Sequence, residues 1–287
     1  MKNCTINKNI HLLENKIFEG ERPLFKSHHI DLKNCQFVQG ESGLKFVNYI
    51  NAIQCEFSSK YLFWHDTRVH IFKSIFNDGA RASIWYSDSI LLENCEVNSA
   101  KIFRDAKNIT IKNSTLNTNE TLWDCNNIII DKVDFQGDYL LFHSNNIEMN
   151  DFHLEGNYSF QHTQNIVAKN IKIKSKDAFW NSENVTIYDS IIEGEYLGWY
   201  SKNLKFVNCT IIGTQPLCYA KNLVLENCEM IDTDLAFEDS TINATITSSI
   251  MSVKNPLSGY LKAKEIKELI LDEQNDLLQI EIENKID

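Results

Sequence analysis

The chain lacks an apolar run long enough to cross a membrane, and it lacks a surplus of positive charge. No stretch of 18 apolar residues occurs among its 287 residues, and Met1–Lys16 contains no uninterrupted apolar core of the signal-peptide kind. With 28 Lys and Arg against 39 Asp and Glu, the net charge is −11. Nucleic acids and anionic membranes need a basic footprint, so we expect neither as the main partner. Because no signal-peptide core is present, we expect a cytoplasmic location.

Signatures of metal sites are missing as well. No Cys-x-x-Cys pair occurs, so we expect no structural zinc and no cofactor. Of the eight cysteines, five occupy one place in a repeat described below, where other copies carry Ser, Val, Phe or Ile: Cys35, Cys55, Cys95, Cys209 and Cys228. Such interchange is typical of a small buried position, since free Cys behaves as a small hydrophobe. We therefore favour reduced core thiols over disulfides, although Cys209 and Cys228 would lie within bridging range.

What the sequence does contain is a repeat of about 19 residues. Asn184–Ile192, Asn203–Ile211 and Asn222–Met230 read NVTIYDSII, NLKFVNCTI and NLVLENCEM, each followed by a turn and an aromatic segment. With Val185 as phase zero, equivalent apolar residues recur at steps of 19 to 21: Ile10, Ile30, Ile50, Val69, Ile90, Ile109, Ile128, Ile147, Ile166, Leu204, Leu223 and Ile242. Apolar residues alternate with polar ones around each of these positions. The pattern predicts a β-solenoid of about 13 coils of 19–20 residues.

Asparagine and glycine recur in the turns of this repeat. Asparagine stands just before phase zero in Asn108, Asn127, Asn146, Asn165, Asn184, Asn203 and Asn222. Stacked in register, these amides would bond along the axis while tolerating a left-handed turn, which we interpret as a structural role. Glycine recurs at Gly20, Gly40, Gly79, Gly137, Gly156, Gly194 and Gly213, which predicts a turn with positive φ in each of these coils.

Equivalent positions of successive coils form columns of residues. In the second strand of each coil, an apolar column that we expect to face inward is followed by two further columns. The first holds all five tryptophans: Trp64, Trp85, Trp123, Trp180 and Trp199. The second is polar: His65, Tyr86, Asp105, Asp124, His143, His162, Asn181, Tyr200, Tyr219 and Glu238. Burying unpaired carboxylates and imidazoles would be costly. We therefore expect the polar column to face solvent, with the tryptophans packed inside or at the edge of a bend.

The polar column contains the candidate site. Asp105 and Asp124 would stand on consecutive rungs about 4.8 Å apart, where repulsion raises one pKa and creates an acid and a base. This separation matches the geometry of retaining glycoside hydrolysis, and Arg104 would complete the catalytic group. We assign ligand binding to His65, Tyr86, His143, His162, Asn181 and Tyr200. The alternative is a solvated ladder without catalysis; a metal site is disfavoured, because three side chains converge poorly at rung spacing.

Several short motifs carry a family resemblance: GERPLF (Gly20–Phe25), ARASIWY (Ala80–Tyr86), GNYSF (Gly156–Phe160), KDAFWN (Lys176–Asn181), GEYLGWYSKNL (Gly194–Leu204), QPLCY (Gln215–Tyr219) and SVKNPLSG (Ser252–Gly259). With them the chain resembles domain-of-unknown-function family 3737, an uncharacterised bacterial family, over essentially its full length. The resemblance implies an all-β, single-stranded right-handed parallel β-helix of the pectin-lyase-like kind, with no assigned reaction. Gly-His-Gly and Arg-x-Lys are absent, so no pectinolytic mechanism is carried over.

The repeat fades after Ile242, which suggests a division of the chain. We expect the parallel β-helix over 1–260 and a C-terminal cap and tail over 261–287, the cap being strand or helix. The predicted function is carbohydrate binding or carbohydrate chemistry through the polar and aromatic columns, with an oligo- or polysaccharide as partner. The alternative is a non-catalytic scaffold that binds a protein or another copy of itself. The sequence does not decide whether the chain is an enzyme.

Overall fold

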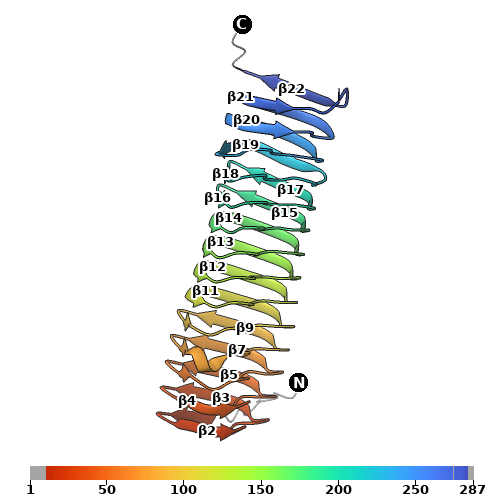
Figure 1. The fold of residues 1–287 in the computed structure, drawn as a ribbon. Helices are drawn as coiled ribbons and strands as arrows, with labels where there is room; N and C mark the ends of the chain where they lie inside the picture. The colour runs from red at the N-terminus through yellow and green to blue at the C-terminus, as the bar shows by residue number, and fades with distance from the viewer. Residues whose placement is uncertain (1–10, 274, 284–287) are drawn as a thin grey trace, which may run out of the picture. The chain divides into compact units, whose positions relative to one another are not determined.

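The computed structural model describes residues 11–273 and 275–283. Regular structure in these residues is β-strand apart from one short 3-10 helix, η1 (Asp78–Ala80). The chain divides into two compact units, Met1–Thr118 and Asn119–Asp287, and each is a stack of parallel strands with one coil of chain per rung (Figure 1). Over the described residues the two units contain about 14 turns, which confirms the predicted all-β solenoid. Ile10, the first predicted rung position, lies outside the described residues.

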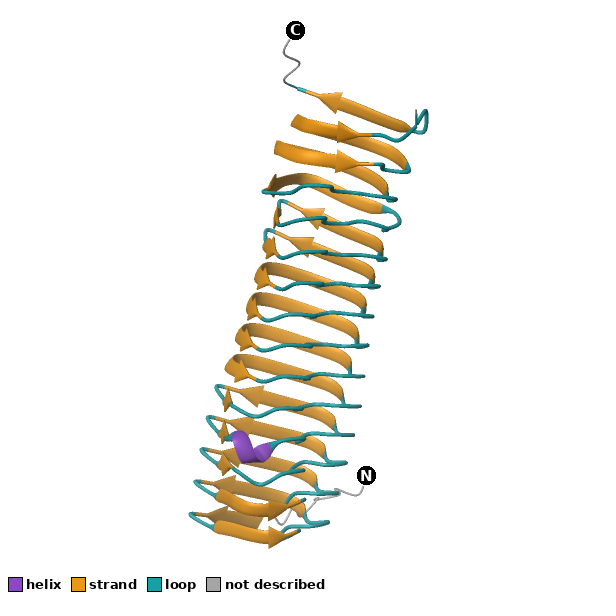
Figure 2. Ribbon diagram, in the orientation of Figure 1, coloured by secondary structure: helices purple, strands orange, loops and turns teal. Residues whose placement is uncertain are grey.

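Most coils of the first unit contribute two strands, joined by a short bend (Figure 2). One parallel series consists of β1 (His11–Glu14), β3 (His28–Lys33), β5 (Asn48–Ile53), β7 (Thr67–Phe72), β9 (Asp88–Glu93) and β11 (Lys107–Asn117). The other consists of β2 (Ile17–Glu21), β4 (Gln36–Glu41), β6 (Glu56–Phe57), β8 (Ile75–Phe76) and β10 (Glu96–Val97). Ile50 pairs with Ile30 and Val69, so the predicted phase-zero positions share one register.

The second unit follows the same rule, with strands of 3 to 14 residues. They are β12 (Asn126–Gln136), β13 (Asn145–Glu155), β14 (Gln164–Lys174), β15 (Glu183–Tyr188), β16 (Ile191–Glu193), β17 (Lys202–Val207), β18 (Thr210–Ile212), β19 (Leu223–Ile231), β20 (Thr241–Lys254), β21 (Ser258–Ile270) and β22 (Leu278–Ile282). β21 runs across the boundary predicted after residue 260, and β22 pairs with it in parallel. The segment expected as strand or helix is therefore strand, while its capping role stays a prediction.

Burial follows the predicted phases. In β13 the apolar side chains Ile147, Met149, Phe152 and Leu154 are buried, and the residues between them are exposed or half-buried. This alternation, with one three-residue step, is what a bent strand with a single buried face requires. The seven cysteines that the structure describes are buried and free, which confirms the preference for reduced core thiols.

The asparagine column forms a hydrogen-bonded ladder in the second unit. From Asn127 to Asn222 each member has a φ of 55° to 58°, and from Asn146 onward each Nδ2 donates to the Oδ1 of the Asn one rung earlier at 2.8 to 3.2 Å. Asparagine is enriched in this left-handed region, because its short side chain tolerates it. The predicted structural role of the ladder is confirmed.

Close approach between rungs explains the glycines as much as positive φ does. Gly40 has a φ of 109°, and a Cβ at this position would lie 1.9 Å from the carbonyl oxygen of Gly20. The positive φ predicted for Gly79 is wrong, since its backbone lies outside the left-handed region. A Cβ there would nevertheless lie 2.2 Å from the carbonyl oxygen of Ser58. Steric exclusion by the neighbouring rung also applies at Gly156, Gly194 and Gly213, whereas a Cβ at Gly20 would meet no atom within 4 Å, so only its φ of 80° favours glycine there.

Substitution of Asn184 tests the ladder. Asn184→Ala removes two inter-rung hydrogen bonds. It also places alanine, whose methyl group cannot form a local hydrogen bond, at a φ of 58°. We expect a loss of about 1–2 kcal/mol in the free energy of unfolding, measured by urea denaturation. Asn184→Gly is the matched control, because it relieves the backbone strain and leaves only the lost hydrogen bonds. Equal stability of the Ala variant and the native chain would contradict the structural role.

Candidate functional site

The polar column lies on the outside of the coils, as predicted. Tyr86 and Tyr200 are 43% and 49% exposed, and His65, Asp105, Asp124, His143 and Asn181 are exposed as well, whereas His162 is half-buried. The five tryptophans are half-buried at the turn beside this column. Of the two places predicted for them, the edge of a bend is therefore the one observed.

The tryptophans of the first unit are engaged on both ring faces. The rings of Trp64 and Trp85 stack with centroids 5.2 Å apart, and each Nε1 donates to a backbone carbonyl of the next coil. The Lys45 ammonium lies 4.9 Å from the Trp64 centroid, and the Arg104 guanidinium lies 5.0 Å from that of Trp85. Each contact is a cation–π interaction. These two rings therefore offer edges, and no free face, to a ligand.

Members of the polar column also pair with one another. The His65 ring stacks between Phe46 and Tyr86 at 4.8 and 4.9 Å. Partial desolvation between the two rings, and then the charge of Lys45, lowers the pKa of His65, which favours the neutral imidazole. In the second unit, His143 Nδ1 lies 2.7 Å from Asp124 Oδ1, and His162 Nδ1 lies 2.8 Å from Asn181 Nδ2. Inter-rung pairing of this kind is what a solvated ladder requires.

The predicted catalytic group divides between the two units. Arg104 and Asp105 belong to the first unit, and Asp124 belongs to the second. Arg104 covers Trp85, and Asp124 contacts His143. Their convergence on a substrate stays a prediction.

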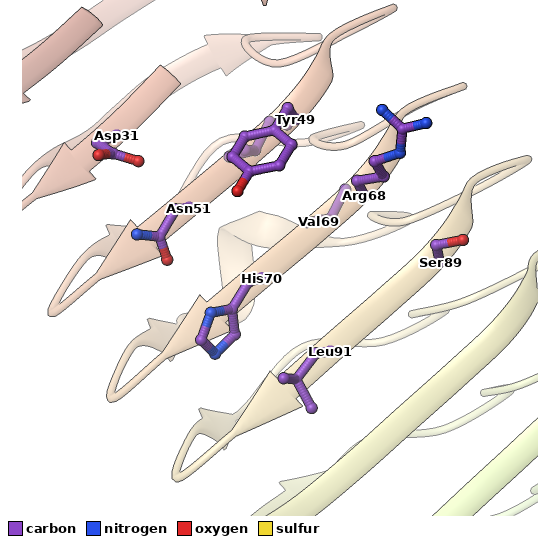
Figure 3. Close-up of a pocket in the computed structure, with 9 residues that line it drawn as sticks. Asp31, Tyr49, Asn51, Arg68, Val69, His70, Ser89 and Leu91 are labelled. Atoms are coloured by element: carbon purple, nitrogen blue, oxygen red, sulfur yellow. The ribbon is translucent and has the colours of Figure 1, made fainter. Parts of the chain in front are cut away.

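A cavity that the sequence analysis missed lies on the outer face of the first unit. It has a volume of about 430 Å³ and spans β3, β5, β7 and β9 (Figure 3). Its lining residues are Asp31, Tyr49, Ile50, Asn51, Arg68, Val69, His70, Ser89 and Leu91. The volume falls within the range of roughly 300–1,000 Å³ that is typical of small-molecule sites.

This cavity lies where the asparagine column is interrupted. On β3, β5, β7 and β9 the positions just before phase zero hold His29, Tyr49, Arg68 and Ser89, with φ values of 53°, 71°, 55° and 62°. A bulky side chain in the left-handed region costs about 1–2 kcal/mol, which Asn largely avoids. Positive φ also recurs at bulky residues elsewhere in the coils, such as Phe63 and Leu141, so this column departs from the repeat by its residue types and not by its backbone. The interruption is visible in the sequence and could have located the site.

Several polar groups along the cavity are unsatisfied. Asn51 Oδ1 and His70 Nε2 are buried atoms without a hydrogen-bond partner, and the nearest acidic contact of His70 Nε2 is Glu93, at 3.9 Å. Among the residues that the structure describes, the side chains of Asp31 and Arg68 have neither a hydrogen bond nor an ion pair. An unsatisfied buried polar atom costs about 1–3 kcal/mol. The lining residues of the cavity thus include two side chains without a partner, Asp31 and Arg68, and two with a buried unpaired atom, Asn51 and His70.

Asp66, two residues before Arg68, is a second anomaly of this unit. It occupies a buried column that holds small residues in other coils, such as Ser87, Ser144 and Ser182. Its Oδ1 accepts the Val47 N–H at 2.7 Å, whereas its Oδ2 has no partner. Burial raises the pKa of Asp66 to about 8, against which the backbone hydrogen bonds act only in part.

Replacing Asp66 tests its cost to the fold. Unfolded Asp66 ionises near pH 3.8, whereas the folded chain keeps it protonated up to about pH 8. The free-energy cost of burying Asp66 in the folded chain therefore grows as the pH rises between these values. Asp66→Ser, the residue usual in this column, should raise the free energy of unfolding by roughly 2–4 kcal/mol at pH 8 and by little at pH 4. Urea denaturation at both pH values measures this. Asp78→Ser, at an exposed position, is the control, and a gain that does not depend on pH would contradict the account.

Neither metal-binding clusters nor membrane spans occur in the described part of the chain. No group of three or more His, Cys, Asp or Glu side chains within it could hold a metal ion. None of its helices is long and apolar enough to cross a membrane.

Comparison with known proteins identifies a family and several similar folds. A family model described as "Protein of unknown function (DUF3737)" matches residues 11–283, and no curated protein sequence matches the chain. The surface adhesin PfbA of Streptococcus pneumoniae is similar with a TM-score of 0.39 and 9% identity, over 84% of this chain and 75% of that one. The tailspike protein of E. coli bacteriophage HK620, in complex with a pentasaccharide, is similar with a TM-score of 0.32 and 8% identity, over 89% of this chain and 63% of that one. The periplasmic alginate epimerase AlgG is similar with a TM-score of 0.27 and 9% identity, over 94% of this chain and 75% of that one.

Proposed function

We propose that this chain, which belongs to the DUF3737 family of proteins of unknown function, is a carbohydrate-binding β-helix whose ligand occupies the cavity of the first unit. The observation that carries the proposal is the set of unsatisfied polar groups on three consecutive rungs, β3, β5 and β7, at the point where the asparagine ladder is interrupted. Similarities at 8–9% identity do not show a function, so the proposal rests on the geometry of the chain itself.

The chemistry of the cavity suits a polyhydroxylated ligand. A sugar hydroxyl both donates and accepts, so it can satisfy the Asp31 carboxylate, the Asn51 amide and the His70 imidazole alike. Small rotations of Asn51 and His70 would bring their unpaired atoms to the ligand. The Tyr49 ring stacks on His29 with centroids 5.4 Å apart, which holds it rigidly at the cavity wall. Rigid aromatic and planar polar groups lose little entropy on binding.

Restoring the asparagine ladder at Tyr49 tests this proposal. Tyr49→Asn places the usual residue of the column at a φ of 71°, so the variant should fold at least as stably as the native chain. It should weaken the binding of any oligosaccharide that the native chain selects from a glycan panel at least tenfold, as measured by titration calorimetry. Tyr188→Asn is the control on β15 of the second unit, where the tyrosine is exposed and lies outside the cavity.

Two results would contradict the cavity as the site. One is a panel in which no glycan binds the native chain. The other is unchanged affinity in Tyr49→Asn together with lost affinity in Tyr200→Ala, which would move the ligand to the polar column. The residues predicted there, His65, Tyr86, His143, His162, Asn181 and Tyr200, are the second proposed surface for the same ligand class.

Catalysis by Asp105, Asp124 and Arg104 is a separate proposal. If Asp105 and Asp124 act as acid and base, then Asp105→Asn and Asp124→Asn fold normally and lose any glycan-processing activity by at least a hundredfold. The measurement is the release of reducing ends from the bound oligosaccharide. Full activity in both variants would exclude these carboxylates as the catalytic pair.

A non-catalytic scaffold is the alternative function, and one observation favours it. The pairs Asp124–His143 and His162–Asn181 satisfy their own polar groups, so this stretch of the column needs no ligand to complete its hydrogen bonds. Regular, self-satisfied faces of solenoids are common protein-binding surfaces.

A further inference from the structure

Arg68 is the residue of the cavity that the unbound chain explains least. It lies on β7 with an exposed side chain, and its φ of 55° falls where the second unit carries asparagine. Its guanidinium has no hydrogen bond or ion pair with any described residue. A long cationic side chain therefore stands in a column of asparagines and makes none of the inter-rung hydrogen bonds that the asparagines make. Such a local departure from the pattern of the fold is expected where a ligand is bound.

The acidic groups around the cavity leave the charge of Arg68 available. Glu93 faces His70, at 3.9 Å from Nε2. Asp31 lies on β3, two rungs away, and Figure 3 shows it on the opposite side of the cavity from Arg68. The cavity is therefore polarised, with a cation at one end and a carboxylate at the other.

We infer that the ligand is an acidic saccharide whose carboxylate is held by Arg68, an inference that rests on the carbohydrate-binding function proposed above. The planar guanidinium can donate two parallel hydrogen bonds to a carboxylate, which adds geometric specificity to the charge attraction. The hydroxyls of the same sugar would then extend toward Asn51, His70 and Asp31. Asp31 disfavours a second anionic group at its own end, so the ligand carries its charge on the Arg68 side.

A matched pair of probes tests the acid preference. One is a tetrasaccharide of glucuronic acid, and the other is the same tetrasaccharide after reduction of its carboxylates to hydroxymethyl groups. By titration calorimetry in 50 mM NaCl, the native chain should bind the acidic form about tenfold more tightly. Arg68→Asn, which completes the asparagine column, should bind both forms equally. Arg81→Asn, which removes the same charge at an exposed site outside the cavity, should keep the preference.

Each outcome has a distinct meaning. Equal binding of both probes to the native chain overturns the acid preference and leaves the carbohydrate-binding proposal intact, as does binding of only an unrelated neutral glycan. A preference that survives Arg68→Asn overturns the role of Arg68. Binding of no glycan at all overturns both proposals. If Arg68→Asn does not fold, the native chain still decides, because 500 mM NaCl should abolish most of a charge-based preference and none of a neutral one.

Discussion

Register between successive rungs is the constraint on which the other features of each unit depend. Once Ile50 pairs with Ile30 and Val69, every other position of the coil is also stacked on its equivalent. Like residues then meet at rung spacing, which allows amides to bond along the axis and aromatic rings to stack. The same stacking excludes a Cβ at Gly40 and places five cysteines in buried positions. We propose the functional site at a place where this column pattern is broken.

Much of the fold could be predicted because the register has a period visible in the sequence. The phase-zero residues and the asparagine ladder followed from 19-residue spacing alone, and the polar column could be assigned to solvent from the cost of burying Asp105 or Asp124. The tryptophans were harder, because spacing does not show how far a bend turns a side chain outward. Gly79 was assigned the wrong backbone, since spacing cannot distinguish a need for positive φ from steric exclusion by the neighbouring rung.

The cavity could not be predicted to the same extent. The interruption of the asparagine column by Tyr49, Arg68 and Ser89 is legible in the sequence, but spacing does not tell whether such residues fill a space or frame one. The unpaired atoms of Asn51 and His70 depend on side-chain geometry across three strands. The buried Asp66, close to the same rung, adds an energetic cost that the pattern of its column would have avoided. Asp66 and Arg68, which both depart from the residue types of their columns, thus lie in one coil.

Amide chemical-shift mapping by NMR during titration with a bound oligosaccharide tests the central claim most directly, because it locates the ligand without any substitution. The account predicts shifts concentrated at the rungs of β3, β5, β7 and β9, at Asn51, Arg68 and His70 above all, with the amides of His143 to Asn181 unaffected. Shifts centred on the polar column, with the amides around the cavity unchanged, would contradict it.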